Sequence, residues 1–188
     1  MQNYHRHSYY SNILTVADSA VSNSAYAKRA KELDQKVLCS VEHGWQGYYH
    51  QTYELAKKNE LKCVIGSEAY WVKNRFEQDR SNHHIVILCK SNMGREALND
   101  ALSEANITGY YYRPRLDLEL LLKLPPKDVL ITSACISFSG YEDIDDIILQ
   151  LHNRFQDNFL LEIQYHLTEK QKIWNEHLLQ ISEKYGLS

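Results

Sequence analysis

The fold is decided by the run Val37-Leu38-Cys39-Ser40-Val41-Glu42-His43-Gly44, in which a short apolar stretch ends in an acid, an imidazole and a glycine. Such a run is typical of a buried strand, and the glycine lets the backbone turn sharply after it. Five further strands are predicted, over residues 3–7, 62–66, 85–89, 128–132 and 159–163. Several of these strands also end in polar side chains.

Amphipathic stretches separate the strands, and each predicts a helix. They cover residues 23–33, 47–59, 94–105, 116–122 and 142–155, and a last helix begins at Thr168 with a capping box to Gln171. Strands that alternate with helices are typical of βα units around a parallel sheet or barrel. Neither a repeat nor a flexible linker interrupts the pattern, so we expect one domain over residues 1–188.

The composition excludes several classes of protein. The 188 residues are 44% hydrophobic and 24% charged, and no apolar run approaches the roughly 20 residues that span a bilayer. The start of the chain resembles no signal peptide, so we expect a cytoplasmic protein without membrane contact. The net charge of −3 lacks the basic excess of a stand-alone nucleic-acid binder, so any such contact must be local. The four cysteines form no Cys-x-x-Cys pair, which favours reduced thiols.

The residues best suited to chemistry lie at strand ends. His5 and His7 close the first predicted strand and project from one face, although this pair alone also fits an ordinary exposed N-terminus. His43, Glu68 and Cys135 follow the ends of three further strands, which meet at one mouth in a parallel barrel. Imidazole, carboxylate and thiolate together suit zinc, manganese or iron. A carboxylate that bridges two such ions indicates phosphoester hydrolysis.

Seven short motifs occur along the chain: His-x-His-Ser-x-Tyr-Ser at 5–11, Glu-His-Gly at 42–44, Ile-Gly-Ser-Glu-Ala-Tyr at 65–70, His-Ile-Val-Ile-Leu at 84–88, Pro-Arg-Leu-Asp at 114–117, Thr-Ser-Ala-Cys at 132–135 and Leu-Glu-Ile-Gln at 161–164. Together they resemble the PHP domain of the bacterial DNA polymerase III alpha subunit, a C-family polymerase, in a divergent form that a phage could encode. This resemblance implies a distorted (β/α)7 TIM-like barrel with up to three divalent metal ions, zinc, manganese or iron, at its mouth.

The resemblance also implies which residues bind the metals: His5, His7, Asp18, His43, Glu68, His84 and Cys135. Glu68 and His43 are the implied catalytic residues. Asp18 is chosen by its distance from the Lys28–Leu33 helix, with a few residues inserted after His7. His84 precedes its strand, which in a parallel barrel would direct it away from the mouth, so His83 is an equal candidate.

Other positions depart from the family pattern. Glu42 stands where the family usually has an aspartate, and we expect it to orient the neighbouring imidazole from outside the metal site. His166 would share a face with Glu162 and is a candidate for substrate contact, or else a solvated histidine in a loop. The family's last strand, with an Asp-x-His pair, is absent before Ser188, so we expect six βα units and an incomplete barrel.

The function implied by the resemblance is that of a metal-dependent phosphoesterase in a replicative polymerase, trimming DNA 3′ ends with a metal-bound hydroxide. Its partners would be polymerase domains or replisome subunits, and nucleotidyl transfer would lie outside this chain. Two alternatives stay open, a free-standing phosphatase of small phosphomonoesters and a non-catalytic scaffold.

Residues 110–115 remain to be explained, because their tyrosines are followed by arginines. The pattern fits either a stacking surface for a single strand or a long connection packed on the barrel.

Overall fold

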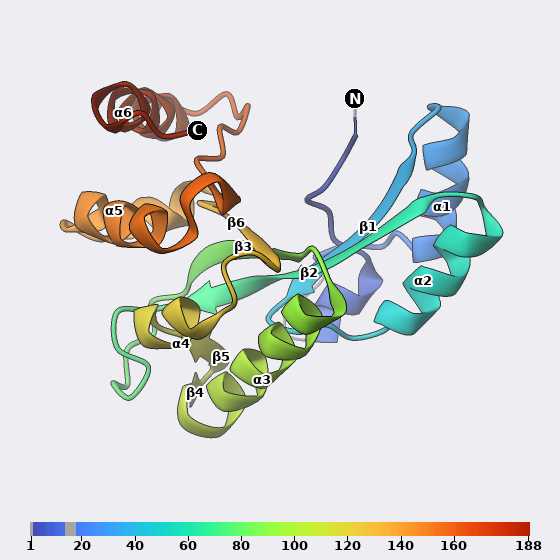
Figure 1. Ribbon diagram of the computed structural model, residues 1–188, viewed down its shortest axis with the longest axis horizontal. Coiled ribbons are helices and arrows are strands. Elements are labelled where there is room, and N and C mark those ends of the chain that lie inside the picture. The colour runs from blue at the N-terminus through green and yellow to red at the C-terminus, as the bar shows by residue number, and fades with distance from the viewer. Residues whose placement is uncertain (1, 14–17) are drawn as a thin grey trace.

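The computed structural model describes residues 2–13 and 18–188, which form one mixed sheet surrounded by helices (Figure 1). The strands are β1 (Val37–His43), β2 (Lys62–Trp71), β3 (His83–Cys89), β4 (Tyr110–Tyr111), β5 (Arg113–Leu116), β6 (Val129–Thr132) and β7 (Phe159–Leu160). The α-helices are α1 (Asn23–Glu32), α2 (Tyr49–Lys58), α3 (Asn92–Thr108), α4 (Leu118–Lys123), α5 (Ile144–Phe155) and α6 (Glu169–Tyr185). Short 3-10 helices are η1 (Tyr9–Ile13), η2 (Ile136–Gly140) and η3 (Gln156–Asn158). None of the helices in these ranges is long and apolar enough to cross a membrane.

The central strand of the sheet is β2. β1 and then β5 lie parallel along one of its edges, and β3 runs antiparallel along the other. Beyond β3, β6 is antiparallel to it, and β7 is parallel to β6. The predicted parallel sheet is therefore wrong in part. β3 is reversed because the connection over residues 72–82 contains no helix, and a parallel crossover needs a longer, usually helical, connection.

The prediction of a first strand over residues 3–7 is wrong, because these residues belong to no β-ladder. The segment lies beside β1, where the Cys39 thiol donates to the carbonyl oxygen of Tyr4. Toward the other end of the sheet, His5 Nδ1 lies 3.1 Å from Glu162 Oε1, just after β7. No backbone ladder joins β7 to β1 within residues 2–13 and 18–188. The α/β class is confirmed, and the distorted, incomplete (β/α)7 barrel remains a prediction.

The predicted helices are present, and side-chain caps mark the starts of α1, α3, α4 and α6. Ser22 accepts a hydrogen bond from the backbone of Ala25 at the start of α1, and Thr168 accepts one from Gln171 at the start of α6. The segment after α3, which includes residues 110–115, contains the β4–β5 hairpin and then α4. The strand predicted over 159–163 ends at Leu160, because the next backbone N–H groups donate outside the sheet, to the Ser188 carbonyl and the Ser133 hydroxyl.

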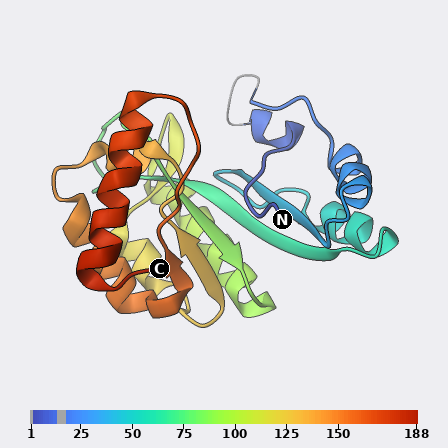
Figure 2. The same ribbon diagram turned by 90° about the horizontal axis from the view of Figure 1, so that it is seen from above.

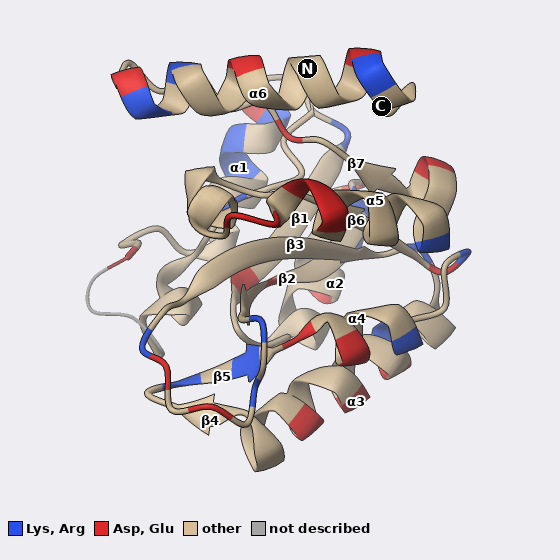
Figure 3. Cartoon of the chain, turned by 90° about the vertical axis from the view of Figure 1, so that its left-hand side faces the viewer, with Lys and Arg blue, Asp and Glu red and all other residues tan. Residues whose placement is uncertain are grey.

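Successive side chains along a strand point to opposite faces of the sheet. One face packs into the core, and the other carries the candidate site residues. Trp71 and Ile85 point into the largest core, which α3, α5 and α6 cover. Residues of the opposite parity, among them Glu68 and His84, face the other side, above a small apolar floor that includes Val86. Figure 2 shows β2 running between α1 and α2 at one end and α5 and α6 at the other, with the N-terminal segment between them. Figure 3 shows α6 and α5 on one side of β3 and α3 on the other.

Candidate metal centre

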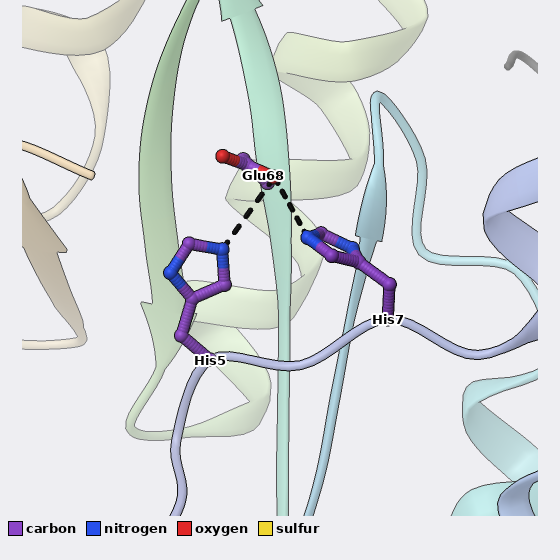
Figure 4. Close-up of side chains that lie close together, drawn as sticks. All are labelled: His5, His7 and Glu68. Carbon is purple, nitrogen blue, oxygen red and sulfur yellow. Dashed lines mark ion pairs between the residues drawn. The ribbon is translucent and has the colours of Figure 1, made fainter. Parts of the chain in front are cut away.

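Glu68 lies at the centre of the candidate site. Its carboxylate is only 3% exposed. Four imidazoles approach it, with His7 Nε2 at 2.9 Å, His84 Nδ1 at 3.1 Å, His43 Nδ1 at 3.2 Å and His5 Nε2 at 3.5 Å. Figure 4 shows His5 and His7 reaching it from the N-terminal segment. Residues far apart in the sequence therefore converge on one carboxylate.

Strand register brings His43 and His84 to this point. His43 is the last residue of β1 and pairs with Glu68 in the parallel β1–β2 ladder. His84 pairs with Tyr70 near the end of β2, because β3 is antiparallel and starts where β2 ends. The expectation that His84 points away from the mouth is wrong for this reason.

His83 lies on the opposite face of β3 and does not join the cluster around Glu68 among the described residues. Its Nδ1 is hydrogen-bonded to the carbonyl group of Ser137, and its ring centroid lies 4.4 Å from that of Tyr141. It lines a separate cavity of about 700 Å³ between η2 and α6. Of the two candidates, the structure brings His84 to Glu68.

Asp18 and Cys135 each lie against one imidazole of the cluster. Asp18 Oδ1 is 3.6 Å from His43 Nε2, and the residues inserted between His7 and Asp18 include 14–17, which lie outside the described residues. Cys135 Sγ is 3.5 Å from His84 Nδ1. Burial opposes the Cys135 thiolate, but His84 and Ser137 outweigh it and lower the pKa of the thiol. The thiolate is the form that binds metals.

Three groups of possible ligands overlap in this cluster. Within each group the ligand atoms lie within 4.8 Å of one another; the groups are His5, His7 and Glu68, then His7, Asp18 and His43, then His43, Glu68 and His84. Because His7, His43 and Glu68 each belong to two groups, neighbouring ions could share them.

His43 shows that the residues fit a divalent cation. Its Nδ1 is buried and makes no hydrogen bond within the described residues, although Glu68 Oε2 lies 3.2 Å away. Burial lowers the pKa of His43 to about 4, and nearby His7 and His84 add to this effect while Glu68 opposes it. A neutral imidazole whose nitrogen faces a carboxylate and lacks a hydrogen-bond partner is a suitable ligand for zinc or a similar ion.

Without a metal, protons compensate the charge of the carboxylates. Burial disfavours a charged His5 ring, but Glu162 and Glu68 raise the pKa of His5 to about 10. Burial likewise opposes the charge on His84, and Cys135 and Glu68 raise its pKa to about 9. Glu68 itself is buried, yet hydrogen bonds from His5, His7 and His84 hold its pKa well below the ordinary value. Glu68 is therefore ionised and able to bridge cations.

Glu162 belongs to the site, although the sequence analysis gave it no role of its own. Its Oε1 lies 3.1 Å from His5 Nδ1, and its carboxylate also accepts hydrogen bonds from Thr132 and Gln164. With Nδ1 of His5 engaged, Nε2 is directed at Glu68. The signal was an acid between two apolar residues, Leu161 and Ile163, at the end of a predicted strand.

Glu42 has a different role from the expected one. Strand alternation turns it away from the ring of His43. It accepts hydrogen bonds from the Ser8 backbone at 3.0 Å and from three hydroxyl groups, those of Ser8, Ser11 and Ser40. Ser11 Oγ lies 3.2 Å from His7 Nδ1 and accepts the backbone N–H of His43. Glu42 therefore positions His7 through Ser11, which leaves His7 Nε2 facing Glu68.

His166 is exposed and lies outside the ligand groups of the described residues. Its Nε2 lies 3.2 Å from Gln164 Oε1. The Nε2 of the same Gln164 donates a hydrogen bond to Glu162 Oε1. Its connection to the site is through these two side chains.

The chain is similar to several known proteins. Residues 3–166 match the family model described as PHP domain. The DNA polymerase III subunit alpha of Borreliella burgdorferi is 30% identical over 197 residues, covering 97% of this chain and 17% of that protein. That of Aquifex aeolicus is 28% identical, covering 92% of this chain and 16% of that protein. The chain thus spans about one sixth of the length of these relatives.

A solved structure has the same fold. It is that of a candidate metal-dependent phosphoesterase from Bifidobacterium adolescentis, which matches with a TM-score of 0.66 at 10% sequence identity. The match covers 99% of this chain and 84% of that one.

Proposed function

Because the chain belongs to the PHP domain family, we propose that it is the metal-dependent phosphoesterase module of a replicative polymerase of the polymerase III alpha type, trimming DNA 3′ ends. The observation that carries the proposal is the ionised Glu68 carboxylate within 3.5 Å of four imidazoles. The similarity to polymerase subunits supports DNA as substrate and the rest of a polymerase as partner. We place nucleotidyl transfer outside this chain, which spans about one sixth of the length of these relatives.

Divalent cations, when bound, supply water activation and stabilise charge on the phosphoryl oxygens. Glu68 bridges the ligand groups, and His43, the most buried imidazole of the cluster, belongs to two of them. Glu162 and Ser11 fix the rings of His5 and His7 by holding the nitrogens that face away from Glu68. The low exposure of Glu68 keeps competing water away from the bridging position.

The direct test is shortening of a 5′-labelled single-stranded oligonucleotide by the purified chain with manganese. We expect loss from the 3′ end, and a decrease of at least about 100-fold in Glu68→Gln, which keeps the shape of the side chain and removes its charge. Glu54→Gln, exposed on α2, is the matched control and should retain activity. No activity from a fully metal-loaded chain would contradict catalysis and favour the scaffold.

A free-standing phosphatase is the second candidate, supported by the likeness in fold to the Bifidobacterium protein over almost the whole chain. Hydrolysis of p-nitrophenyl phosphate without shortening of DNA would favour this candidate over the exonuclease.

A further inference from the structure

An arginine–tyrosine surface lies at the tip of the β4–β5 hairpin. It is made of Tyr112 and Arg113 from the hairpin and Arg80 from the connection between β2 and β3. Tyr112 is 54% exposed at the tip of the hairpin. The guanidinium carbon of Arg80 lies 4.5 Å from the centroid of the Tyr112 ring, and its Nη2 donates to the tyrosine hydroxyl at 2.6 Å. Arg113 follows directly, and its Nη1 donates to the backbone carbonyl of Tyr112. An aromatic ring in solvent is thus combined with two guanidinium groups.

The backbone of Tyr112 is strained. Tyr111 and Arg113 pair with each other, so Tyr112 alone makes the turn, with a φ of 61°. Glycine or asparagine adopts this left-handed conformation more readily than a tyrosine. Five other described non-glycine residues also have a positive φ, so the strain supports a function for this exposed ring only together with the arginines beside it.

Two of the four arginines around the hairpin are held by the fold. Arg75 forms ion pairs with Asp117 and Glu119. Arg115 is 1% exposed and donates to four backbone carbonyl oxygens, those of Gly109, Arg75, Glu77 and Asp79. Arg80 and Arg113 make no ion pair with any described residue. Their two positive charges remain available to a partner.

The surface leads to the metal centre. The guanidinium carbon of Arg113 lies 5.7 Å from the centroid of the Tyr70 ring. That ring lies 5.8 Å from the His43 ring and 5.4 Å from the His84 ring. Arg113 is therefore separated from the cluster by one side chain, that of Tyr70. Figure 3 shows the basic residues of β5 next to β4 at this end of the molecule.

We propose that Arg80, Tyr112 and Arg113 bind the single-stranded nucleic acid that enters the metal centre. A base stacks on Tyr112, and successive phosphates contact Arg80 and Arg113, as on stacking platforms for single strands. Because the net charge of the chain is −3, its surface as a whole does not attract nucleic acid. Binding would therefore depend on a local basic site such as this one. This inference rests on the proposed function, because it takes the metal centre as the end of the path.

The test is fluorescence anisotropy of 5′-fluorescein oligothymidylate with the full chain in EDTA, which measures binding without metal or hydrolysis. Tyr112→Leu should weaken binding about ten-fold, whereas Tyr112→Phe, which keeps the ring, should stay within about two-fold of the wild type. Tyr112→Gly removes both ring and strain, so it should lose binding without losing thermal stability. Binding by Tyr112→Leu equal to that of the wild type would overturn the proposal.

The arginines are tested through salt dependence. A double substitution, Arg80→Gln with Arg113→Gln, should reduce the slope of log affinity against log salt by about 1.4, because each neutralised phosphate of a single strand contributes about 0.7. Tyr49 and Arg95 provide the matched control, since the Arg95 guanidinium carbon lies 4.9 Å from the Tyr49 ring on another surface. Tyr49→Leu with Arg95→Gln should change neither affinity nor slope. An unchanged slope in the Arg80 and Arg113 variant would overturn the proposal.

The two proposals fail separately. A wild-type chain that binds the oligonucleotide through Tyr112 but hydrolyses no phosphoester supports the surface and contradicts the proposed function. If the chain hydrolyses p-nitrophenyl phosphate but its binding of the oligonucleotide does not depend on Tyr112, only the proposed binding surface is contradicted.

Discussion

At the scale of single residues, the site depends on a buried charge that imidazoles compensate. Glu68 is 3% exposed, and such a group is strongly destabilising unless it is paired and hydrogen-bonded. His5, His7, His43 and His84 surround it, and Glu162 and Ser11 in turn hold two of these rings. Metal binding and protonation therefore compete for the same nitrogens.

This competition predicts proton release. Since the pKa of His5 is raised to about 10 and that of His84 to about 9, both rings carry a proton at pH 7 in the metal-free chain. Cation binding should then release about two protons per chain at pH 7, and the affinity should fall as the pH is lowered. Calorimetric titration with zinc in buffers of different ionisation enthalpy gives the number. Binding without proton release would contradict the assignment of His5 and His84 as ligands.

Glu42 predicts an effect on stability. Its buried carboxylate accepts hydrogen bonds from one backbone N–H group and three serine hydroxyls, and the amide of Glu42→Gln cannot accept all of them. We expect the free energy of unfolding to fall by about 2–3 kcal/mol. Urea denaturation in EDTA measures this. Glu54→Gln should stay within about 0.5 kcal/mol of the wild type, and equal stability of both variants would refute the role of Glu42.

Sequence reasoning was most successful for residues that local motifs identify. The resemblance selected His5, His7, His43, Glu68 and His84, which the structure brings together. It gave Glu162 no role, because the partner of Glu162, His5, lies far away in the sequence. It expected Glu42 to orient His43, whereas Glu42 acts on His7 through Ser11, another distant residue. Contacts of this kind are decided by tertiary packing and leave no local pattern.

At the scale of elements, the direction of β3 is the decisive feature. Apolar patterning located the strand, but the same pattern fits either direction. The connection over residues 72–82 contains no helix, and the strand runs antiparallel to β2. This reversal places His84 beside the end of β2, where a parallel strand would have placed Cys89.

The close β2–β3 pairing predicts that replacing Gly66 destabilises the fold. A Cβ at Gly66 would lie 2.2 Å from the carbonyl oxygen of Ile87 in β3, so Gly66→Ala must displace one strand from the other. We expect about 1–3 kcal/mol of destabilisation and a lower metal content, because Glu68 and His84 lie on the displaced strands. Thermal unfolding and metal analysis measure both effects.

Gly186→Ala separates steric from backbone effects. A Cβ at Gly186 meets no atom within 4 Å, although its φ is 69°. This variant should lose about 1 kcal/mol of stability through strain and keep its metal content. A Gly66→Ala chain that keeps its metal as well would contradict the dependence of the site on strand register.

At the scale of the whole molecule, the metal centre connects segments that are distant in the sequence. Ligand candidates come from the N-terminal segment, β1, β2, β3 and the connection after β6. Within the described residues no ladder joins β7 to β1, so a bound cation would link parts that the sheet does not link directly.

Metal removal should therefore lower thermal stability. A cation present at about 100 times its dissociation constant adds about 2.7 kcal/mol, which corresponds to roughly 5–10 °C for a chain of this length. Calorimetry with EDTA and after re-addition of zinc or manganese measures the shift. The melting temperature of the Glu68→Gln variant should change neither with EDTA nor with added zinc or manganese. Equal melting of the wild type with and without metal would contradict a linking role.

The central claim is that Glu68 organises four imidazoles into a binding site for divalent cations. Mass-spectrometric metal analysis of the purified, dialysed chain tests it most directly. The account predicts about one or more zinc, manganese or iron ions per wild-type chain, the same content in Glu54→Gln, and less than about one tenth of it in Glu68→Gln. A wild-type chain with negligible metal, or a Glu68→Gln chain with the wild-type content, would contradict the claim.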